Sequence, residues 1–355
     1  MSTPAPLGRY RWRVCAVLFF ATTVNYIDRN VLSFTMLDPI FRHQILGLPP
    51  DQPLGAADLA RFKELMGYVD AIFKLAYGAG FLATGYLIDR IGTRRGFVTS
   101  ISVWSVAGIA HGLVNSVAGL GLSRFLLGLG EAGNFPAAIK TVAEWFPKKE
   151  RSFATGLFNA GANVGIILTA IGVPWIIAHW GWSSGFVVTG ALGAAVLVAW
   201  VAVYRRQDQH PHVSAAELAY IQQDRALSTS EAPVKWRHLL PYRATWAFGT
   251  AKFLTDAVWW FYLTWLPSFF NENPAFTERL DLKSVGLPFL IIYIISDLGS
   301  VFFGWVATRL IANGWSVNAA RKATMLVCAL CVLPILLAAI TTSLTVAIAL
   351  IALAT

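Results

Sequence analysis

The sequence is poor in charged residues. Only 13% of its 355 residues are Asp, Glu, Lys or Arg, whereas 56% are hydrophobic. A soluble domain carries about a quarter charged residues, so this composition excludes an ordinary soluble enzyme or binding domain. We therefore expect most segments of this chain to lie in a lipid bilayer.

Cysteines are also scarce. Cys15, Cys328 and Cys331 lie in or beside apolar runs, which excludes the disulfide framework of a small secreted protein. Cys328-x-x-Cys331 matches a redox motif only in its spacing. His210 and His212 lack Cys or carboxylate partners at ligand spacing, so no metal site is predicted.

The chain has no basic stripe interleaved with aromatic residues, although its net charge is +9. Its Lys and Arg residues fall in short clusters between apolar runs, which predicts no nucleic-acid partner. The first apolar stretch contains Asn25, Asp28 and Arg29 and is not followed by a small-residue cleavage pattern. We expect a retained first helix rather than a signal peptide.

Long apolar runs are what the chain has in abundance. A spanning helix needs about 20 mostly apolar residues, and a tenth such run begins near Leu344. The sequence therefore predicts an all-α membrane protein. The nine complete runs are 14–36, 65–88, 96–117, 119–144, 150–178, 182–204, 243–270, 284–310 and 320–341.

The basic clusters lie in alternate loops, while the short loops around Ser116 and Gly181 carry no Lys or Arg. This asymmetry predicts a cytoplasmic N-terminus. The long polar stretch 205–242 contains Ser214-x-x-Glu217, which favours a capping box that opens a surface helix. We expect a six-helix bundle over 1–204, a cytoplasmic linker over 205–242, and a partial second bundle of about three and a half helices over 243–355.

Residues 85–95 read GYLIDRIGTRR, an acidic and arginine-rich turn between two apolar runs. Gly85 would let a helix pack closely, Asp89 and Arg90 would end it in water, and Gly92 would permit a tight reversal. With Arg94, this spacing resembles the loop after the second helix in the major facilitator superfamily. The resemblance implies two pseudo-symmetric six-helix bundles, and it implies that these five residues latch one conformation.

A weaker copy of this glycine and arginine pattern lies between residues 304 and 322. Two related halves would explain the repetition. A chain that ends at Thr355 inside an apolar run would then lack the rest of its second bundle. We expect the sequence to be a fragment of a twelve-helix protein.

Charged and polar residues inside the predicted spans indicate where function lies. Each such charge costs roughly 2.5–3.5 kcal/mol on insertion scales and usually faces a bundle interior or cavity. At about 1.5 Å per residue, they lie roughly 18–24 Å from the cytoplasmic helix ends, where transporters of this kind bind cargo. They are Asp28, Arg29, Tyr77, Glu131, Asn163, Asp256 and Asp297.

Arg124 and Glu131 are seven residues apart and share a helix face. They form either a structural ion pair or a carboxylate whose proton affinity depends on whether the arginine holds a substrate anion. The glycines of Gly128-x-Gly130-x-x-Gly133 match a dinucleotide fingerprint in spacing only. Because they lie inside a span, we expect them to allow close helix packing.

Asp28 and Arg29 are adjacent and do not face each other on a helix. Arg29 can address a cavity together with Asn25 and Tyr26, with Asp28 at the flank. A structural contact between Asp28 and Arg29 is the alternative.

Lys74 and Tyr77 share a face of the second span. Neutralisation of Lys74 by Asp70, one turn earlier, is the alternative to a role in binding. Asn159 and Asn163 share a face of the fifth span and either bind sugar hydroxyls or link helices. The segment 252–262 combines two charges with a dense aromatic cluster. Core packing is the first interpretation of these aromatic residues, and stacking on a sugar ring is the second.

Five segments resemble the anion:cation symporter family, and specifically bacterial hexuronate and related sugar-acid transporters. They are NYIDRNVL at 25–32, FKLAYGAG at 73–80, SRFLLGLGEAG at 123–133, EWFPKKERSFATGLFNAGANVG at 144–165 and DAVWWFYLTWLPSFF at 256–270. The resemblance implies that Asp28 and Glu131 are proton sites and that Arg124 couples to Glu131.

The same resemblance implies that Arg29 contacts the substrate carboxylate and that two tyrosines line the sugar site. Ala162 stands where some relatives have a glutamine, which weakens the expectation for the neighbouring Asn163. The expected substrate-binding residues are Asn25, Tyr26, Arg29, Lys74, Tyr77, Asn159 and Asn163.

The sequence thus predicts a transporter and not an enzyme. We expect proton-coupled import of a sugar acid such as glucuronate or galacturonate by alternating access, in a monomer of the bacterial inner membrane with no cofactor but protons. Galactonate, glucarate or tartrate are alternative cargoes. An organophosphate exchanger of the same fold is a further alternative, against which Asp28, Glu131 and Asp256 argue.

Overall fold

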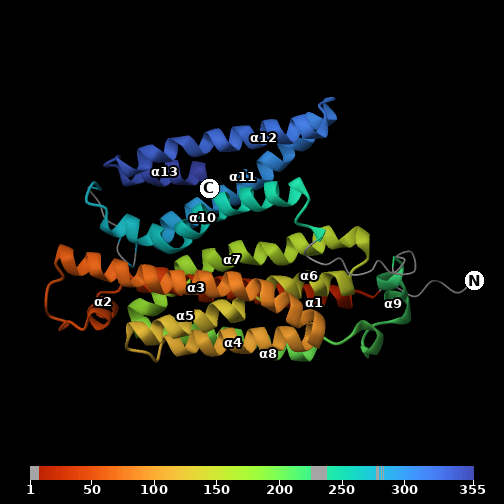
Figure 1. Ribbon diagram of the computed structural model, residues 1–355, viewed down its shortest axis with the longest axis horizontal. Coiled ribbons are helices and arrows are strands. Elements are labelled where there is room, and N and C mark those ends of the chain that lie inside the picture. The colour runs from red at the N-terminus through yellow and green to blue at the C-terminus, as the bar shows by residue number, and fades with distance from the viewer. Residues whose placement is uncertain (1–7, 225–237, 277–279, 281, 283) are drawn as a thin grey trace, which may run out of the picture.

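The computed structural model describes residues 8–224, 238–276, 280, 282 and 284–355 (Figure 1). The predicted linker 205–242 therefore lies partly outside the described residues. All regular elements within these ranges are helices, as predicted. They are α1 (Tyr10–Thr35), α2 (Pro39–Leu46), α3 (Ala56–Ile91), α4 (Thr93–His111), α5 (Val117–Glu131), α6 (Asn134–Trp145), α7 (Lys148–Trp180), α8 (Trp182–Val203), the 3-10 turn η1 (Gln207–Gln209), α9 (Ala215–Gln222), α10 (Arg243–Glu272), α11 (Gly286–Ala312), α12 (Val317–Val332), the 3-10 segment η3 (Leu333–Ala339) and α13 (Leu344–Ala354).

Two predicted spans are not single α-helices: the run 320–341 continues from α12 into the 3-10 segment η3, and the run 119–144 is broken. The run 119–144 forms two helices, α5 and α6, which separate directly after Glu131. Pro136 has no N–H to donate to the carbonyl of Ala132. The hydroxyl of Thr84 donates to that carbonyl instead, at 3.2 Å. The break thus places Glu131 at a helix end inside the bundle.

A short helix, α2, was not predicted, although its signals are present in the sequence. The Asp38 carboxylate accepts a hydrogen bond from the backbone of Phe41 at 2.9 Å, and Pro39 occupies the first turn. Gly47 ends the helix with a φ of 69°. These are ordinary start and stop signals, but the helix is too short to appear as an apolar run.

Five of the described helical segments are long and apolar enough to cross a bilayer. Helices α1 and α10 are also long, but they carry charged residues within their apolar stretches, such as Arg29 and Asp256. Intramembrane charges of this kind generally face a protein interior or a cavity. The five segments are Ala56–Ile91, Lys148–Trp180, Trp182–Val203, Gly286–Ala312 and Val317–Ala339.

Glycines bring α5 close to its neighbours. A Cβ on Gly128 would clash with the carbonyl of Phe73 on α3, and a Cβ on Gly130 would clash with the backbone of Trp104 on α4. The prediction that these glycines allow close packing is confirmed. The same prediction for Gly85 is wrong, because nothing lies within 4 Å of its Cβ position. Helix α3 instead meets its neighbours through other faces at this level, for example through Ile88, which packs against α4.

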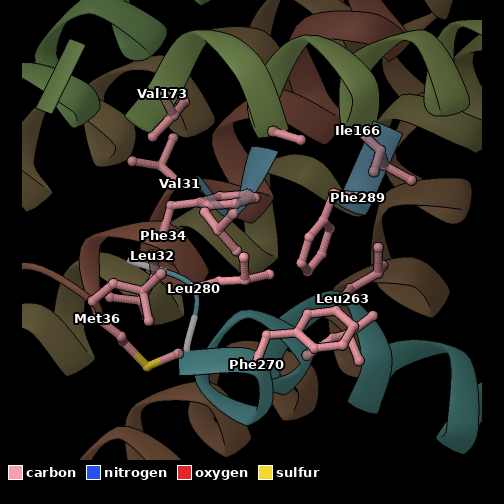
Figure 2. Packing of buried hydrophobic residues seen from close by; sticks show 14 of the residues in the cluster. Val31, Leu32, Phe34, Met36, Ile166, Val173, Leu263, Phe270, Leu280 and Phe289 are labelled. Carbon is pink, nitrogen blue, oxygen red and sulfur yellow. The ribbon is translucent and has the colours of Figure 1, made fainter. Parts of the chain in front are cut away.

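The helices form two groups, α1–α8 and α10–α13, which lie on opposite sides in Figure 1. A shared hydrophobic cluster joins them at the end opposite the start of α1. Figure 2 shows side chains from α1, α7, α10 and α11 converging there. The labelled members are Val31, Leu32, Phe34, Met36, Ile166, Val173, Leu263, Phe270, Leu280 and Phe289.

Ion pairs reinforce the junction at this end. The carboxylate of Glu272 on α10 lies 2.6 Å from a guanidinium nitrogen of Arg42 on α2 and 2.5 Å from the ammonium of Lys63 on α3. At the end where α1 begins, the described hydrophobic cluster consists of residues of the first group and α9, with Trp260 at its edge. The two groups therefore meet mainly at one end.

The linker helix α9 is fixed to the first group. The Ser214 hydroxyl accepts from the backbone of Glu217 at 3.2 Å, as the capping box predicts. The carboxylate of Glu217, however, accepts from the backbone N–H groups of Tyr10 and Arg11 at 3.2 and 3.1 Å. It therefore caps the start of α1 rather than its own helix.

Candidate functional site

Arg29 is the centre of a buried polar site. Its side chain projects from α1 and is 7% exposed. Its Nε atom donates to Oε2 of Glu131 at 2.8 Å, and a terminal nitrogen donates to Oδ1 of Asn25 at 3.3 Å. Because α5 ends at Glu131, that carboxylate can turn toward α1. Sequence spacing predicted a common depth for Arg29 and Glu131, and the structure brings the two groups into direct contact.

Aromatic rings surround the guanidinium of Arg29. Its central carbon lies 4.6 Å from the ring centroid of Tyr26, 4.7 Å from that of Tyr77 and 4.6 Å from that of Trp260. Cations are attracted to aromatic faces at such distances. Tyr26 and Tyr77 belong to the first group of helices and Trp260 to the second, so the arginine is enclosed from both sides.

Arg124 is not the partner of Glu131. Its guanidinium donates to the backbone carbonyl of Arg29 at 3.2 Å and lies 5.4 Å from the ring of Phe73. Glu131 lies about 10.5 Å farther along the helix, and its carboxylate bonds to Arg29 instead of Arg124. A direct ion pair along α5 is therefore not formed, and the observed ion pair joins α1 to α5. Arg124 and Glu131 still interact electrostatically, so the expected coupling between them stays a prediction.

Asp28 lies beside this centre, buried to 2% exposure. Neither of its carboxylate oxygens has a well-formed hydrogen bond within the described part of the chain, although Thr189 and Arg124 are near enough to interact with it. Oε1 of Glu131 and Nε of Arg124 likewise lack hydrogen-bond partners there. Buried polar groups are normally satisfied, so these are the atoms of the site that can accept or donate further hydrogen bonds.

Lys74 forms a second cationic position. Its ammonium lies 2.6 Å from Oδ2 of Asp70 and 6.0 Å from the ring centroid of Trp260. The other oxygen of Asp70 accepts from the hydroxyl of Thr264 on α10 at 3.3 Å. Asp70 thus neutralises Lys74, as one interpretation of the sequence held, and it also links the two helix groups.

The two asparagines of α7 behave differently. Asn163 donates to the carboxylate of Asp297 on α11 and so forms another bond between the groups. Asn159 is exposed, and no bond joins it to Arg29 or to any other described side chain. The structure therefore places only Asn163 at a polar junction. Farther along α10, Lys252 and Asp256 pair with each other at 2.7 Å.

The five residues expected to form a latch surround the turn between α3 and α4. Asp89 pairs with Lys140 of α6 at 2.7 Å, and Arg94 donates to the carbonyl of Val201 on α8 at 3.0 Å. Arg90 lies 3.5 Å from the hydroxyl of Tyr86. Gly92 has a φ of 86°, a conformation that glycine adopts readily. All of these contacts lie within the first group of helices.

Trp260 and Thr264 are the residues that sequence reasoning missed. Trp260 was interpreted first as core, yet its ring covers Arg29 and approaches Lys74. The available signal was its position one turn after Asp256 on a helix with polar residues inside a span. Among the described residues, no cluster of three His, Cys, Asp or Glu side chains is arranged to hold a metal ion.

Known proteins share this architecture. The chain matches the model of the Major Facilitator Superfamily over residues 18–355. Over 328 residues it is 31% identical to a protein named probable galactarate/D-glucarate transporter from Bacillus subtilis (strain 168), covering 88% of this chain and 68% of the relative. It is 26% identical to the hexuronate transporter of Escherichia coli (strain K12), covering 83% of this chain and 65% of that protein.

A solved structure agrees with the fold. A bacterial homologue of the human lysosomal transporter Spinster, in an inward-facing and occupied conformation, superposes with a TM-score of 0.65 at 18% sequence identity. The match covers the whole of this chain and 72% of that structure. The chain therefore belongs to the Major Facilitator Superfamily, and it is a multi-pass membrane protein with the architecture of a transporter rather than an enzyme.

Proposed function

We propose that this protein is a proton-coupled symporter that imports a sugar acid by alternating access. The observation that carries the proposal is the buried pair of Arg29 and Glu131, enclosed by aromatic rings from both helix groups. An arginine stays charged at physiological pH and can bind a carboxylate through parallel hydrogen bonds. The tyrosine and tryptophan faces can cover the apolar face of a sugar.

Charge balance supports proton coupling. The centre holds three cations and three carboxylates, so it is neutral when all six groups are ionised. An entering cargo anion adds a negative charge at low dielectric, which is costly unless a proton accompanies it. The cations are Arg29, Lys74 and Arg124, and the carboxylates are Asp28, Asp70 and Glu131.

Glu131 and Asp28 are the proposed proton sites. If cargo replaces Glu131 as the partner of Arg29, the Glu131 carboxylate loses its counter-ion. It then binds a proton more readily, because its charge is no longer compensated. Asp28 forms no ion pair in the described part of the chain, so it can take up a proton without breaking one. Release of cargo would restore the bond between Arg29 and Glu131 and expel the proton.

Contacts between the two helix groups can link cargo binding to a change in the orientation of the groups. Trp260 covers Arg29, Thr264 bonds to Asp70, and Asp297 bonds to Asn163. Cargo that rearranges these partners changes the relative stability of the two orientations of the groups. If the N-terminus is cytoplasmic, the end at which the two groups meet faces the outside. The contacts described above for the proposed latch residues at the α3–α4 turn all lie within the first group.

Relatives named for galactarate, D-glucarate and hexuronate support a sugar acid as cargo. Glucuronate and galacturonate are our first candidates, with galactonate, glucarate and tartrate as alternatives. An organophosphate exchanger is less well supported, because these relatives are named for sugar acids and the carboxylates of the site offer proton sites that an exchanger would not need. We further propose that the protein acts as a monomer in the bacterial inner membrane, with residues 1–204 and 243–355 in separate bundles.

A binding experiment tests this site directly. Purified intact protein should be stabilised against heat by one or a few members of a panel of sugar acids, and not by the corresponding neutral sugars. Trp260→Ala should weaken this binding by about tenfold, as expected for the loss of a buried cation–π contact and of covering surface. Trp246→Ala, at an exposed position on the same helix, is the matched control and should bind normally. Equal stabilisation by neutral sugars would contradict the proposal.

A further inference from the structure

A cavity lies far along the bundle from Arg29. It has a volume of about 830 Å³ and is situated where α4 begins and α8 ends. Four arginines line it: Arg94 and Arg95 from the start of α4, and Arg205 and Arg206 from the segment after α8. The proposed transport mechanism uses none of these side chains as a cargo or proton site.

The walls of the cavity are held in place by specific contacts. Trp200 Nε1 donates to the carbonyl of Arg94 at 3.3 Å, and Arg94 donates to the carbonyl of Val201 at 3.0 Å. The Glu144 carboxylate in the wall accepts from Thr93 at 2.8 Å. These hydrogen bonds fix the start of α4 and the end of α8 around the cavity.

The cavity carries excess positive charge. Two carboxylates line it, Glu144 and Asp208, against four guanidinium groups. Asp208 is already paired with Arg206 at 3.0 Å. In the described part of the chain, the guanidinium groups of Arg95 and Arg205 have no ion-pair partner. A formal charge of +2 thus remains inside a concave site.

The cavity lies on the side of the protein that faces lipid, away from the proposed transport path. Helices α4 and α8 pack against other helices of the first group and lie on the side away from α10–α13 (Figure 1). The spanning helix α8 ends at Val203, directly before the cavity. Val198 and Val201 on this helix are 69% and 41% exposed. An acyl chain can lie along this apolar surface while its head group reaches the arginines.

We propose that this cavity binds the phosphate head group of an anionic phospholipid. Arginines bind phosphate oxygens through charge-assisted, often paired hydrogen bonds. Basic cavities at the cytoplasmic ends of membrane helices suit anionic head groups for this reason. A free phosphate ion offers the same oxygens without the acyl chains, so an experiment can distinguish the two sources.

Native mass spectrometry of the intact, delipidated protein measures this binding. Phosphatidylglycerol should bind, and Arg95→Gln combined with Arg205→Gln should weaken its binding at least about tenfold. Phosphatidylcholine should bind weakly to both forms. Arg309→Gln combined with Arg321→Gln removes the same charge from exposed positions in the second group and should leave phosphatidylglycerol binding unchanged. Arg95→Lys combined with Arg205→Lys keeps the charge and should bind phosphatidylglycerol better than the glutamine variant does.

Three results would overturn the proposal. The first is equal phosphatidylglycerol binding by wild type and the variant that carries Gln at 95 and 205. The second is equal binding of phosphatidylcholine and phosphatidylglycerol by wild type. The third is displacement of the lipid by millimolar inorganic phosphate, which would assign the cavity to a soluble anion. Thermal unfolding of each variant checks that the fold is retained.

Discussion

The Nε atom of Arg29 lies 2.8 Å from Oε2 of Glu131, a residue 102 positions later in the chain. Both side chains are almost fully buried. This bond joins α1 to α5 at the depth where aromatic rings from both helix groups meet. Its physical consequence is that neither partner can be changed alone without leaving a buried charge unpaired.

The first prediction concerns this pair. Glu131→Gln should destabilise the protein by about 3–5 kcal/mol, because breaking a buried ion pair leaves an uncompensated charge. Adding Arg29→Gln should restore much of that stability while leaving transport abolished. Thermal unfolding and uptake assays measure the two effects. If the loss in the free energy of unfolding in the double variant equals the sum of the losses in the two single variants, Arg29 and Glu131 do not act as a unit.

A second prediction concerns helix packing. Gly130→Ala should cost about 1–3 kcal/mol, because its Cβ would enter the space occupied by the backbone of Trp104. Gly85→Ala is the matched control, since its Cβ position is open, and should not lower the unfolding temperature because alanine favours a helix over glycine. Equal destabilisation by the two substitutions would show that α4 and α5 are not packed as described.

The third prediction concerns the ion pairs between the two helix groups. Glu272→Gln leaves Arg42 and Lys63 without their shared carboxylate. It should move the population about tenfold toward the state in which this end is open, a change of about 1.4 kcal/mol. Spin labels at Asp51 and Ala275 would report the distance across that end. An unchanged distance distribution would show that the ion pairs of Glu272 do not stabilise the closed state.

His210 provides a prediction about pH. Its ring lies 4.2 Å from that of Tyr10 and 3.3 Å from the carbonyl of Val203 through Nε2. Burial lowers the pKa of His210 below its usual value of 6.5. A histidine with a lowered folded-state pKa contributes stability above the unfolded pKa, and that contribution is lost as the pH falls.

Wild type should therefore lose more thermal stability between pH 7.5 and 5.5 than His210→Phe does. His179→Gln, which changes an exposed histidine, is the control and should follow wild type. A pH dependence that is identical in wild type and His210→Phe would show that this histidine does not couple the linker to the bundle.

Apolar runs were sufficient to predict the helices, because a bilayer requires about 20 apolar residues for each crossing. They were not sufficient to predict α2, which is only eight residues long, or the break after Glu131. That break depends on Pro136 together with Thr84, a residue of another helix whose contact with Ala132 cannot be read from local sequence.

The depth of the site was also predictable, because helical rise converts residue number into height. Arg29, Tyr77 and Glu131 were expected at similar levels and meet in the structure. Their pairing was not predictable, since spacing along one helix says nothing of how neighbouring helices are rotated. The direct ion pair of Glu131 is therefore with Arg29 and not with Arg124, which was the other interpretation of the spacing. Trp260 was missed because it reaches the site from the other helix group.

Proton-driven accumulation tests the central claim most directly. Intact protein in liposomes should concentrate a labelled sugar acid when an inward proton gradient is imposed, and a protonophore should abolish this accumulation. Asp28→Asn should lose gradient-driven accumulation while retaining part of its counterflow exchange, because exchange needs cargo binding without net proton transfer. Uptake that is unaffected by collapse of the proton gradient would contradict the account.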